Sequence, residues 1–153
     1  MKNKIKLSAA VLALLMGASF AAHAQFAKAD DAVEYRQAAF TVMATHFGQI
    51  AAVVKGEKPY DKAALERNAG IVEMMSKLPW AAFPPDSIVG DSKAKPEIWT
   101  AGDKFKTDAD NLQAATAKLS VAAKSGDLNA IKAAFGDTGK ACKTCHQDFK
   151  KKD

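Results

Sequence analysis

The last helical segment of the chain carries both cysteines on its apolar stripe, and this feature constrains the fold most. Residues at steps of three and four along this stripe are Leu128, Ile131, Phe135, Thr138, Cys142, Cys145 and Phe149. This spacing is typical of an amphipathic helix with one buried face. Whatever the two cysteines bind is therefore expected to lie inside the fold rather than on a surface loop.

The two cysteines belong to the pattern C-x-x-C-H, which His146 completes. This pattern is the signature of covalent haem attachment. Two thiols one helical turn apart can add to the two vinyl groups on one edge of a haem, and the adjoining histidine can then reach the iron as an axial ligand. We therefore expect one haem c per chain, attached through Cys142 and Cys145, with His146 on the iron.

Other uses of a C-x-x-C pair need features that this chain offers poorly. A redox dithiol usually lies in a βαβ context, and no strand-like alternation is visible. A zinc site would need a fourth ligand, and His46 is the only other histidine after the first 24 residues. A plain disulfide is the expected fate of the thiols if haem attachment fails.

Residues 1–24 are predicted to be a secretory signal peptide. Lys2, Lys4 and Lys6 precede an apolar run from residue 7 to residue 20, and Ala22-His23-Ala24 forms an A-x-A cleavage site. The alternative, a membrane anchor, is disfavoured because the run is short and contains serine and glycine. No later segment is expected to span a membrane, so residues 25–153 are predicted to form one soluble domain in a bacterial periplasm.

The net positive charge of the chain comes mostly from this leader. The chain has 22 basic and 17 acidic residues, and the leader contains three of the lysines and no acid, so the remainder holds 19 against 17, a net charge of +2. This balance gives no reason to expect nucleic acid as a partner. The lysines at residues 150–152 are predicted to be a solvated helix end, with a docking patch for an acidic partner as the alternative.

Three further helices are predicted before the last one, at about residues 30–54, 61–77 and 96–124. Each has apolar residues at steps of three and four and is bounded by proline, glycine or a capping aspartate. The connection between residues 79 and 95 is unusually long and contains Trp80 and Phe83. These two side chains are expected to close one end of the bundle, to wall a ligand pocket, or both. Four such helices predict an all-α bundle.

Arg36 is a charged residue on the apolar stripe of the first helix. A buried arginine needs an anion, and a haem propionate would supply one. Glu73 and Asp110 are the alternative partners.

At this point the chain resembles the cytochromes c′, the class II c-type cytochromes. The resemblance covers residues 25–153 and rests on Tyr35-Arg36-Gln37, the segment from Pro79 to Phe83, Pro96-Glu97-Ile98-Trp99 and the haem motif near the C-terminus. It implies an antiparallel four-helix bundle, often a homodimer through the first two helices. It also implies that Arg36 lies near a haem propionate, that Gln37 contacts the haem edge, and that Asp91 touches the haem.

The resemblance also bears on the second axial position of the iron. In low-spin relatives a methionine lies one turn after the arginine of the first helix, whereas this chain has Phe40 there. Phenylalanine cannot bind iron, so the resemblance implies a five-coordinate, high-spin haem with Phe40 over the open face. Met43 and His46 are the alternative ligands from the same helix, with Met74 and Met75 on the next.

These observations predict a periplasmic protein that transfers electrons and binds small diatomic gases, NO and CO, rather than an enzyme. The alternative is a dedicated low-spin electron carrier with Met43 as sixth ligand. A third hypothesis, peroxidase-like chemistry, would need an acid–base group over the open site, which only His46 could provide. The expected partners are a second copy of the chain, small gases and an unidentified redox protein, with no membrane or nucleic acid.

Overall fold

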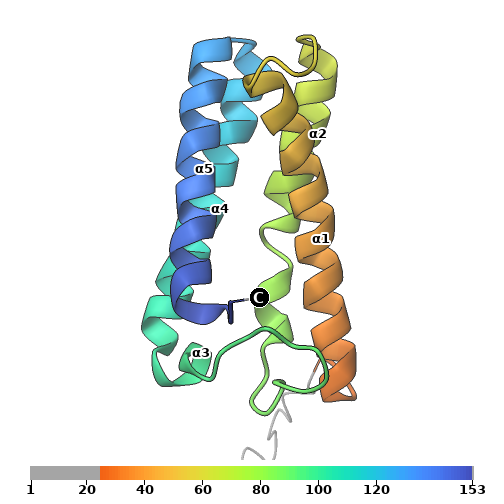
Figure 1. The fold of residues 1–153 in the computed structure, drawn as a ribbon, viewed down its shortest axis with the longest axis vertical. Coiled ribbons are helices and arrows are strands. Elements are labelled where there is room, and N and C mark those ends of the chain that lie inside the picture. The colour runs from red at the N-terminus through yellow and green to blue at the C-terminus, as the bar shows by residue number, and fades with distance from the viewer. Residues whose placement is uncertain (1–24, 153) are drawn as a thin grey trace, which may run out of the picture.

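The computed structural model describes residues 25–152. The predicted signal peptide lies outside these residues. The helical elements in chain order are α1 (Ala29–Val54), α2 (Lys62–Met75), the 3-10 helix η1 (Pro79–Ala82), α3 (Glu97–Thr100), α4 (Gly102–Ser125) and α5 (Leu128–Phe149). Figure 1 shows α1, α2, α4 and α5 side by side along the long axis of the molecule. The predicted four-helix bundle is confirmed.

The helices begin where the sequence predicts caps. The Asp61 side chain accepts a hydrogen bond from Ala64 N, and the Asp127 side chain accepts from Asn129 N and Ala130 N. Such caps satisfy backbone N–H groups that have no partner within the helix. The chain turns from α4 into α5 at Gly126, whose φ of 77° is a conformation that glycine adopts without strain.

The core is formed by the apolar stripes of the four long helices. Its largest fully buried side chains include Ile50, Leu65, Leu119 and Ile131, one from each long helix. Among these helices α1 packs on α2, α2 on α4 and α4 on α5. Between α1 and α5 the packing is sparser, and the main cavity of the molecule lies there.

The predicted helix over residues 96–124 is wrong in one respect, because the structure divides it. Ala101 leaves the helical conformation, with φ −120° and ψ 44°, and α4 starts at Gly102. Glycine propagates a helix poorly. The break also allows the Trp99 indole to donate to Phe83 O at 3.1 Å while Ile98 is buried. Tertiary contacts of the short α3 therefore override the continuous helical pattern.

The chain end also differs from the prediction of a helix that continues to the C-terminus. Helix α5 ends at Phe149. The residues after it pair with the connection between residues 79 and 95, which we call the crossover segment. Lys95 N donates to Phe149 O at 3.0 Å, and Lys151 N donates to Lys93 O at 2.8 Å. Ala94 and Lys150 form an isolated antiparallel bridge between these bonds. The tail is thus attached to the body of the protein beside the cavity.

The prediction that no segment after the leader is apolar enough to span a membrane needs correction. Helix α1 is long enough and apolar enough to do so by length and composition alone. Its many alanines raise its mean hydropathy. It also carries a buried arginine and packs on α2 and η1. Its composition is therefore weak evidence for a membrane span.

Candidate haem-binding site

A cavity of about 1100 Å³ lies between α1 and α5 and is bounded at one end by η1 and the crossover segment. This volume is at the upper end of the roughly 300–1,000 Å³ of ordinary small-molecule sites. All of the site residues predicted from the sequence line it. They are Arg36, Gln37, Phe40, Trp80, Phe83, Asp91, Cys142, Cys145 and His146.

Helix α5 supplies the three residues of the haem motif. Burial of Ile131, Thr138 and Phe149 sets the rotation of this helix. As a consequence Cys142 and Cys145 are half-buried, free thiols on the wall of the cavity. Burial raises the pKa of Cys142, and burial together with the nearby Asp108 carboxylate raises the pKa of Cys145 to about 11. Both thiols are therefore protonated at neutral pH.

These cysteines do not have the surroundings of a zinc site. Within the described residues, no group of three or more histidine, cysteine, aspartate or glutamate side chains is arranged to hold a metal ion. Instead, the two thiols lie one helical turn apart on α5 and face an apolar cavity, which is the arrangement that covalent haem attachment needs.

His146 lies at the open edge of the same cavity, with its side chain partly in solvent. Desolvation by the cavity wall, and then the positive charge of Lys150, lower the pKa of His146. The neutral imidazole, which is the form that binds metals, is thus favoured at physiological pH. Cys142 lies one helical turn before His146 and lines the same cavity, so His146 is the residue that would bind the iron of a haem held by the thiols.

Arg36 is buried, with 3% of its surface exposed, and its guanidinium is held by the crossover segment. It donates to Ala82 O at 2.6 Å, to Ser87 Oγ at 2.8 Å, to Ser87 O at 2.5 Å and to Ser92 Oγ at 2.8 Å. It also lies over the Phe83 ring, 4.5 Å from the ring centre. All of these partners are uncharged.

The two carboxylates considered as alternative partners of Arg36 bind lysines instead. Glu73 pairs with Lys77, and Asp110 pairs with Lys106. Burial lowers the pKa of Arg36, yet a guanidinium remains charged in proteins. The cavity wall therefore contains a buried positive charge for which the described residues provide hydrogen-bond acceptors but no counter-ion.

The Gln37 amide lies beside Arg36 and reaches across to the crossover segment. Gln37 Nε2 donates to Asp91 Oδ1 at 3.2 Å, and both residues line the cavity. Asp91 therefore lies on the cavity wall, and its contact with a haem stays a prediction.

Aromatic side chains form the wall near η1. The Phe40 and Trp80 rings meet edge to face at 6.0 Å, and Phe105 contacts both Trp80 and Phe83 in the same geometry. Trp80 also donates its indole N–H to Ser76 O at 2.6 Å. Trp80 and Phe83 therefore pack at one end of the bundle and line the cavity there.

The two alternative iron ligands on α1 differ in position. Met43 is buried in the core and also lines the cavity. His46 does not line it, because its Nδ1 lies 2.7 Å from Asn68 Oδ1 on the neighbouring helix α2. His46 is therefore poorly placed as a ligand or as an acid–base group in the cavity.

Several residues of the site were not predicted. Ser87 and Ser92 hold Arg36, and Phe47 lines the cavity and stacks on Phe135 with 4.4 Å between the ring centres. Phe47 lies on the apolar stripe of α1 and could have been found from its spacing. The serines carry no periodic signal, since they are ordinary polar residues of a proline- and glycine-rich loop.

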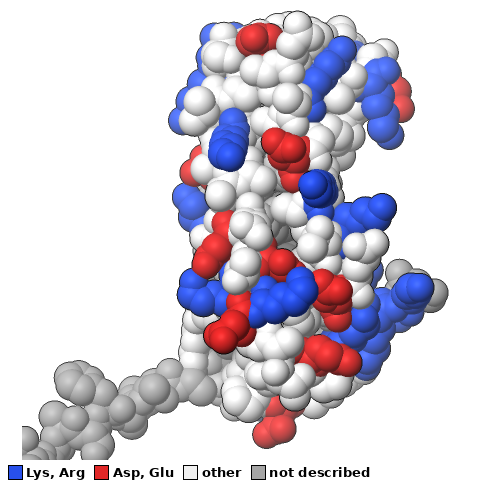
Figure 2. Space-filling model, turned by 90° about the vertical axis from the view of Figure 1, so that its left-hand side faces the viewer, with Lys and Arg blue, Asp and Glu red and all other residues white. Residues whose placement is uncertain are grey.

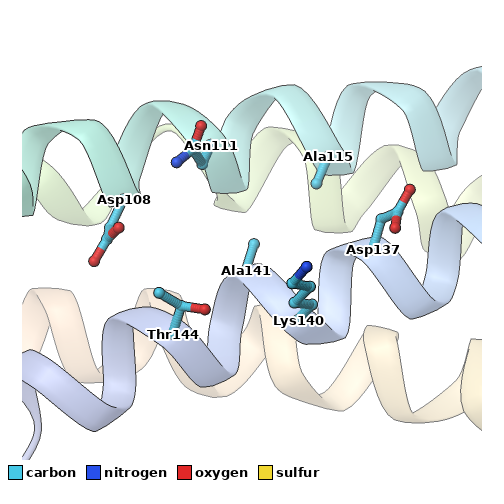
Figure 3. Close-up of a pocket in the computed structure, with 7 residues that line it drawn as sticks. All are labelled: Asp108, Asn111, Ala115, Asp137, Lys140, Ala141 and Thr144. Atoms are coloured by element: carbon cyan, nitrogen blue, oxygen red, sulfur yellow. The ribbon is translucent and has the colours of Figure 1, made fainter.

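A second, smaller pocket of about 230 Å³ lies between α4 and α5. Figure 3 shows Asp108, Asn111 and Ala115 of α4 facing residues of α5 across it. The α5 side consists of Asp137, Lys140, Ala141 and Thr144. This pocket is small, and neither a cysteine nor a histidine lines it, so it is distinct from the haem site.

Comparison with known proteins agrees with this geometry. Residues 31–150 match the family model described as Cytochrome C′. The chain belongs to the cytochrome c′ family. It is 50% identical to the cytochrome c′ of Alcaligenes xylosoxydans xylosoxydans over 128 residues, which are 84% of this chain and 99% of that protein. It is 48% identical to the cytochrome c′ of Rubrivivax gelatinosus over 84% of this chain and 100% of that protein.

Solved cytochromes c′ share the fold. The crystal structure of the Rubrivivax gelatinosus protein has a TM-score of 0.80, covering 83% of this chain and 100% of that one. The nitric oxide complex of a leucine-to-alanine variant of the Alcaligenes xylosoxidans protein also scores 0.80, at 48% identity, over 84% and 100% of the two chains. Cytochromes c′ bind haem c, and this member has the two cysteines that covalent attachment requires.

Proposed function

We propose that this cytochrome c′ holds one haem c in the cavity between α1 and α5. Cys142 and Cys145 would form the two thioether bonds, and His146 would bind the iron. The observation that carries this proposal is that these three residues, within about one turn of α5, line a single large apolar cavity. A haem bound there supplies the redox-active iron, and the protein supplies its orientation and surroundings.

Arg36 is the residue proposed to receive a haem propionate. Its charge is buried at the cavity wall beside Gln37, and its present partners are neutral. A carboxylate placed there would offset a buried cation and would form charge-assisted hydrogen bonds. The same contacts fasten the crossover segment over the cavity, so Arg36 would couple the position of that segment to the bound group.

The second axial position is proposed to be open. Phe40 lies on the α1 wall and cannot bind iron, while His46 is held by Asn68. An open position next to apolar side chains suits small neutral ligands. We therefore infer that the protein binds NO and CO and transfers single electrons. Solved relatives include a nitric oxide complex and a carbon monoxide complex of variants of the Alcaligenes xylosoxidans protein.

The optical spectrum of the haem-loaded protein, ferric and reduced, tests this proposal. An open position predicts a reduced spectrum without a sharp α band, which changes when NO is added. The second candidate, a low-spin carrier with Met43 as sixth ligand, has the support that Met43 lines the cavity. It predicts a sharp, split spectrum that NO leaves unaltered and that Met43→Leu converts to the high-spin form.

Peroxidase-like chemistry is tested through His46. If wild-type protein shows no peroxide turnover, this hypothesis ends; loss of turnover in His46→Ala would support it instead. The hydrogen bond from His46 to Asn68 favours the first outcome.

We also propose a periplasmic homodimer. Val42 on α1 and Met74 on α2 are 39% and 58% exposed, and a second copy packed on these two helices would bury them. Sedimentation velocity measures the assembly, and a monomer at all concentrations would exclude it. Location and processing are tested by recovering the protein from the periplasm of its host and sequencing its N-terminus, which should begin at Gln25.

A further inference from the structure

Five lysines line the mouth of the main cavity: Lys93, Lys143, Lys150, Lys151 and Lys152. We call these residues the lysine rim. They come from the crossover segment, from α5 and from the tail, so they are not one continuous run in the sequence. Lys143, Lys151 and Lys152 are exposed to solvent. The same cavity is lined by Cys142, Cys145 and His146.

Backbone hydrogen bonds hold the segments of the lysine rim together. The pairing of Lys151 N with Lys93 O, at 2.8 Å, joins the tail to the crossover segment. Lys95 strengthens the junction, because its Nζ donates to Gln147 O and Asp148 O at 3.0 and 3.1 Å, the last turn of α5. The positive charges are thus placed at the cavity mouth by the fold and are not carried by a loose chain end.

The charge of this rim contrasts with the rest of the molecule. Without residues 1–24 the chain has 19 basic and 17 acidic residues, so removing the five rim lysines leaves 14 basic against 17 acidic. Among the described residues that line the cavity, Asp91 is the only acidic one. On the face formed by α4 and α5, Figure 2 shows acidic and basic side chains interleaved, and basic side chains gather at the lower right.

We propose that the lysine rim is a docking surface for an acidic electron-transfer protein. The proposal rests on the haem site proposed above, since a partner on the rim would lie at the mouth of the cavity that holds the haem. One electron would pass between the iron and the partner's redox centre, with no bond made or broken. Clusters of one charge around a cleft raise association rates by roughly 10- to 1,000-fold, and salt removes the effect.

A protein surface fits the lysine rim better than a membrane surface. Binding to lipid generally combines basic residues with apolar side chains that enter the interface. The exposed large apolar residues of the described chain are Val42, Tyr60, Met74, Leu78 and Val121. None of them belongs to the rim, so the rim offers charge without an apolar anchor.

The first test compares two small one-electron oxidants of opposite charge acting on the reduced holoprotein. Hexacyanoferrate(III) is an anion, and tris(phenanthroline)cobalt(III) is a cation. Two haem propionates would bring the net charge near zero, so a rate governed by net charge would hardly depend on salt. We expect the anion to react about tenfold more slowly, and the cation faster, as ionic strength rises from about 0.01 to about 1 M.

The second test uses charge-matched variants. Lys143→Gln, Lys151→Gln and Lys152→Gln together remove three charges from the rim, whereas Lys118→Gln, Lys124→Gln and Lys132→Gln remove three exposed charges from elsewhere. The rim variant should lose most of the salt dependence, both with hexacyanoferrate(III) and when an acidic plant-type ferredoxin reduces the ferric protein. The control variant should keep it.

Equal behaviour of the two variants, or rates independent of salt, would overturn the docking proposal. Rim-dependent binding to phosphatidylserine vesicles at physiological salt, with electron-transfer rates unaffected, would overturn it in favour of a membrane surface. The haem content and spectrum of each variant are measured first. A protein without covalent haem would refute the proposed function, whereas a normal haem protein without rim-dependent rates would refute the docking surface alone.

Discussion

Replacement of Arg36 by methionine tests how the crossover segment is held over the cavity. Methionine keeps most of the apolar stem and removes the guanidinium. The variant would leave the carbonyls of Ala82 and Ser87 and the hydroxyls of Ser87 and Ser92 without their present donor. Ser87 and Ser92 are buried, at 0% and 7% exposure, so water can replace the lost bonds only if the segment opens.

The magnitude follows from the number and kind of these bonds. Hydrogen bonds to a charged group contribute about 1.5–3 kcal/mol each, so the four bonds together contribute roughly 6 kcal/mol at the lower value. Removing a buried charge recovers part of its desolvation cost, which reduces the loss. We expect Arg36→Met to lower the free energy of unfolding by about 3–5 kcal/mol, because buried neutral acceptors lose a charged donor. Arg36→Lys should retain part of the stability that the guanidinium contributes, because an ammonium keeps the charge but not the planar fork.

Urea unfolding of the haem-loaded protein measures this loss, with Arg67→Met as control, since Arg67 is exposed on α2. Trypsin cleavage at Lys93 and Lys95 gives a local readout, because an unfastened crossover segment should be cut before the bundle unfolds. If Arg36→Met is as stable as Arg67→Met and the segment resists trypsin equally, Arg36 does not hold the segment and the reasoning fails.

Three further outcomes are expected. Phe40→Ala should accelerate CO binding to the reduced protein by roughly tenfold or more, equivalent to about 1.4 kcal/mol of barrier; unchanged rates in flash photolysis would remove Phe40 from the ligand path. Burial and Asp108 raise the pKa of Cys145 from 9.0 to about 11, so the protonated thiol favours the folded form of the haem-free protein. This contribution to the free energy of unfolding should be complete below pH 9.0 and should be lost as pH rises toward 11. Urea titrations that show the same decline in Cys145→Ala would contradict this. Asp127→Ala should cost about 1 kcal/mol through loss of the α5 cap, while Asp127→Asn should cost little; equal urea midpoints for Asp127→Ala and wild type would refute the cap.

The long helices and the attachment motif were predictable because their signals are local. Steps of three and four, a capping aspartate and a C-x-x-C-H pattern each depend on residues within a few turns of one another. The same period placed Cys142 and Cys145 on the buried face of α5, and the structure agrees. Resemblance to a family, not periodicity, placed Gln37 and Asp91 at the site, where they form a hydrogen bond.

The partners of Arg36 were decided by the tertiary structure. Its position on an apolar stripe predicted that it needs an anion, and the structure adds neutral acceptors from residues 46 to 56 positions away. The break at Ala101 has the same origin, because the pattern over residues 96–124 is helical and contacts of Trp99 with Phe83 interrupt it. The lysine rim depends on pairing between residues 93–95 and 149–151. The sequence by itself determined the helices and the chemistry of the haem motif, since both depend on near neighbours in the chain. Only the tertiary structure decided what surrounds that motif, because packing and loop closure bring together side chains that no short-range pattern connects.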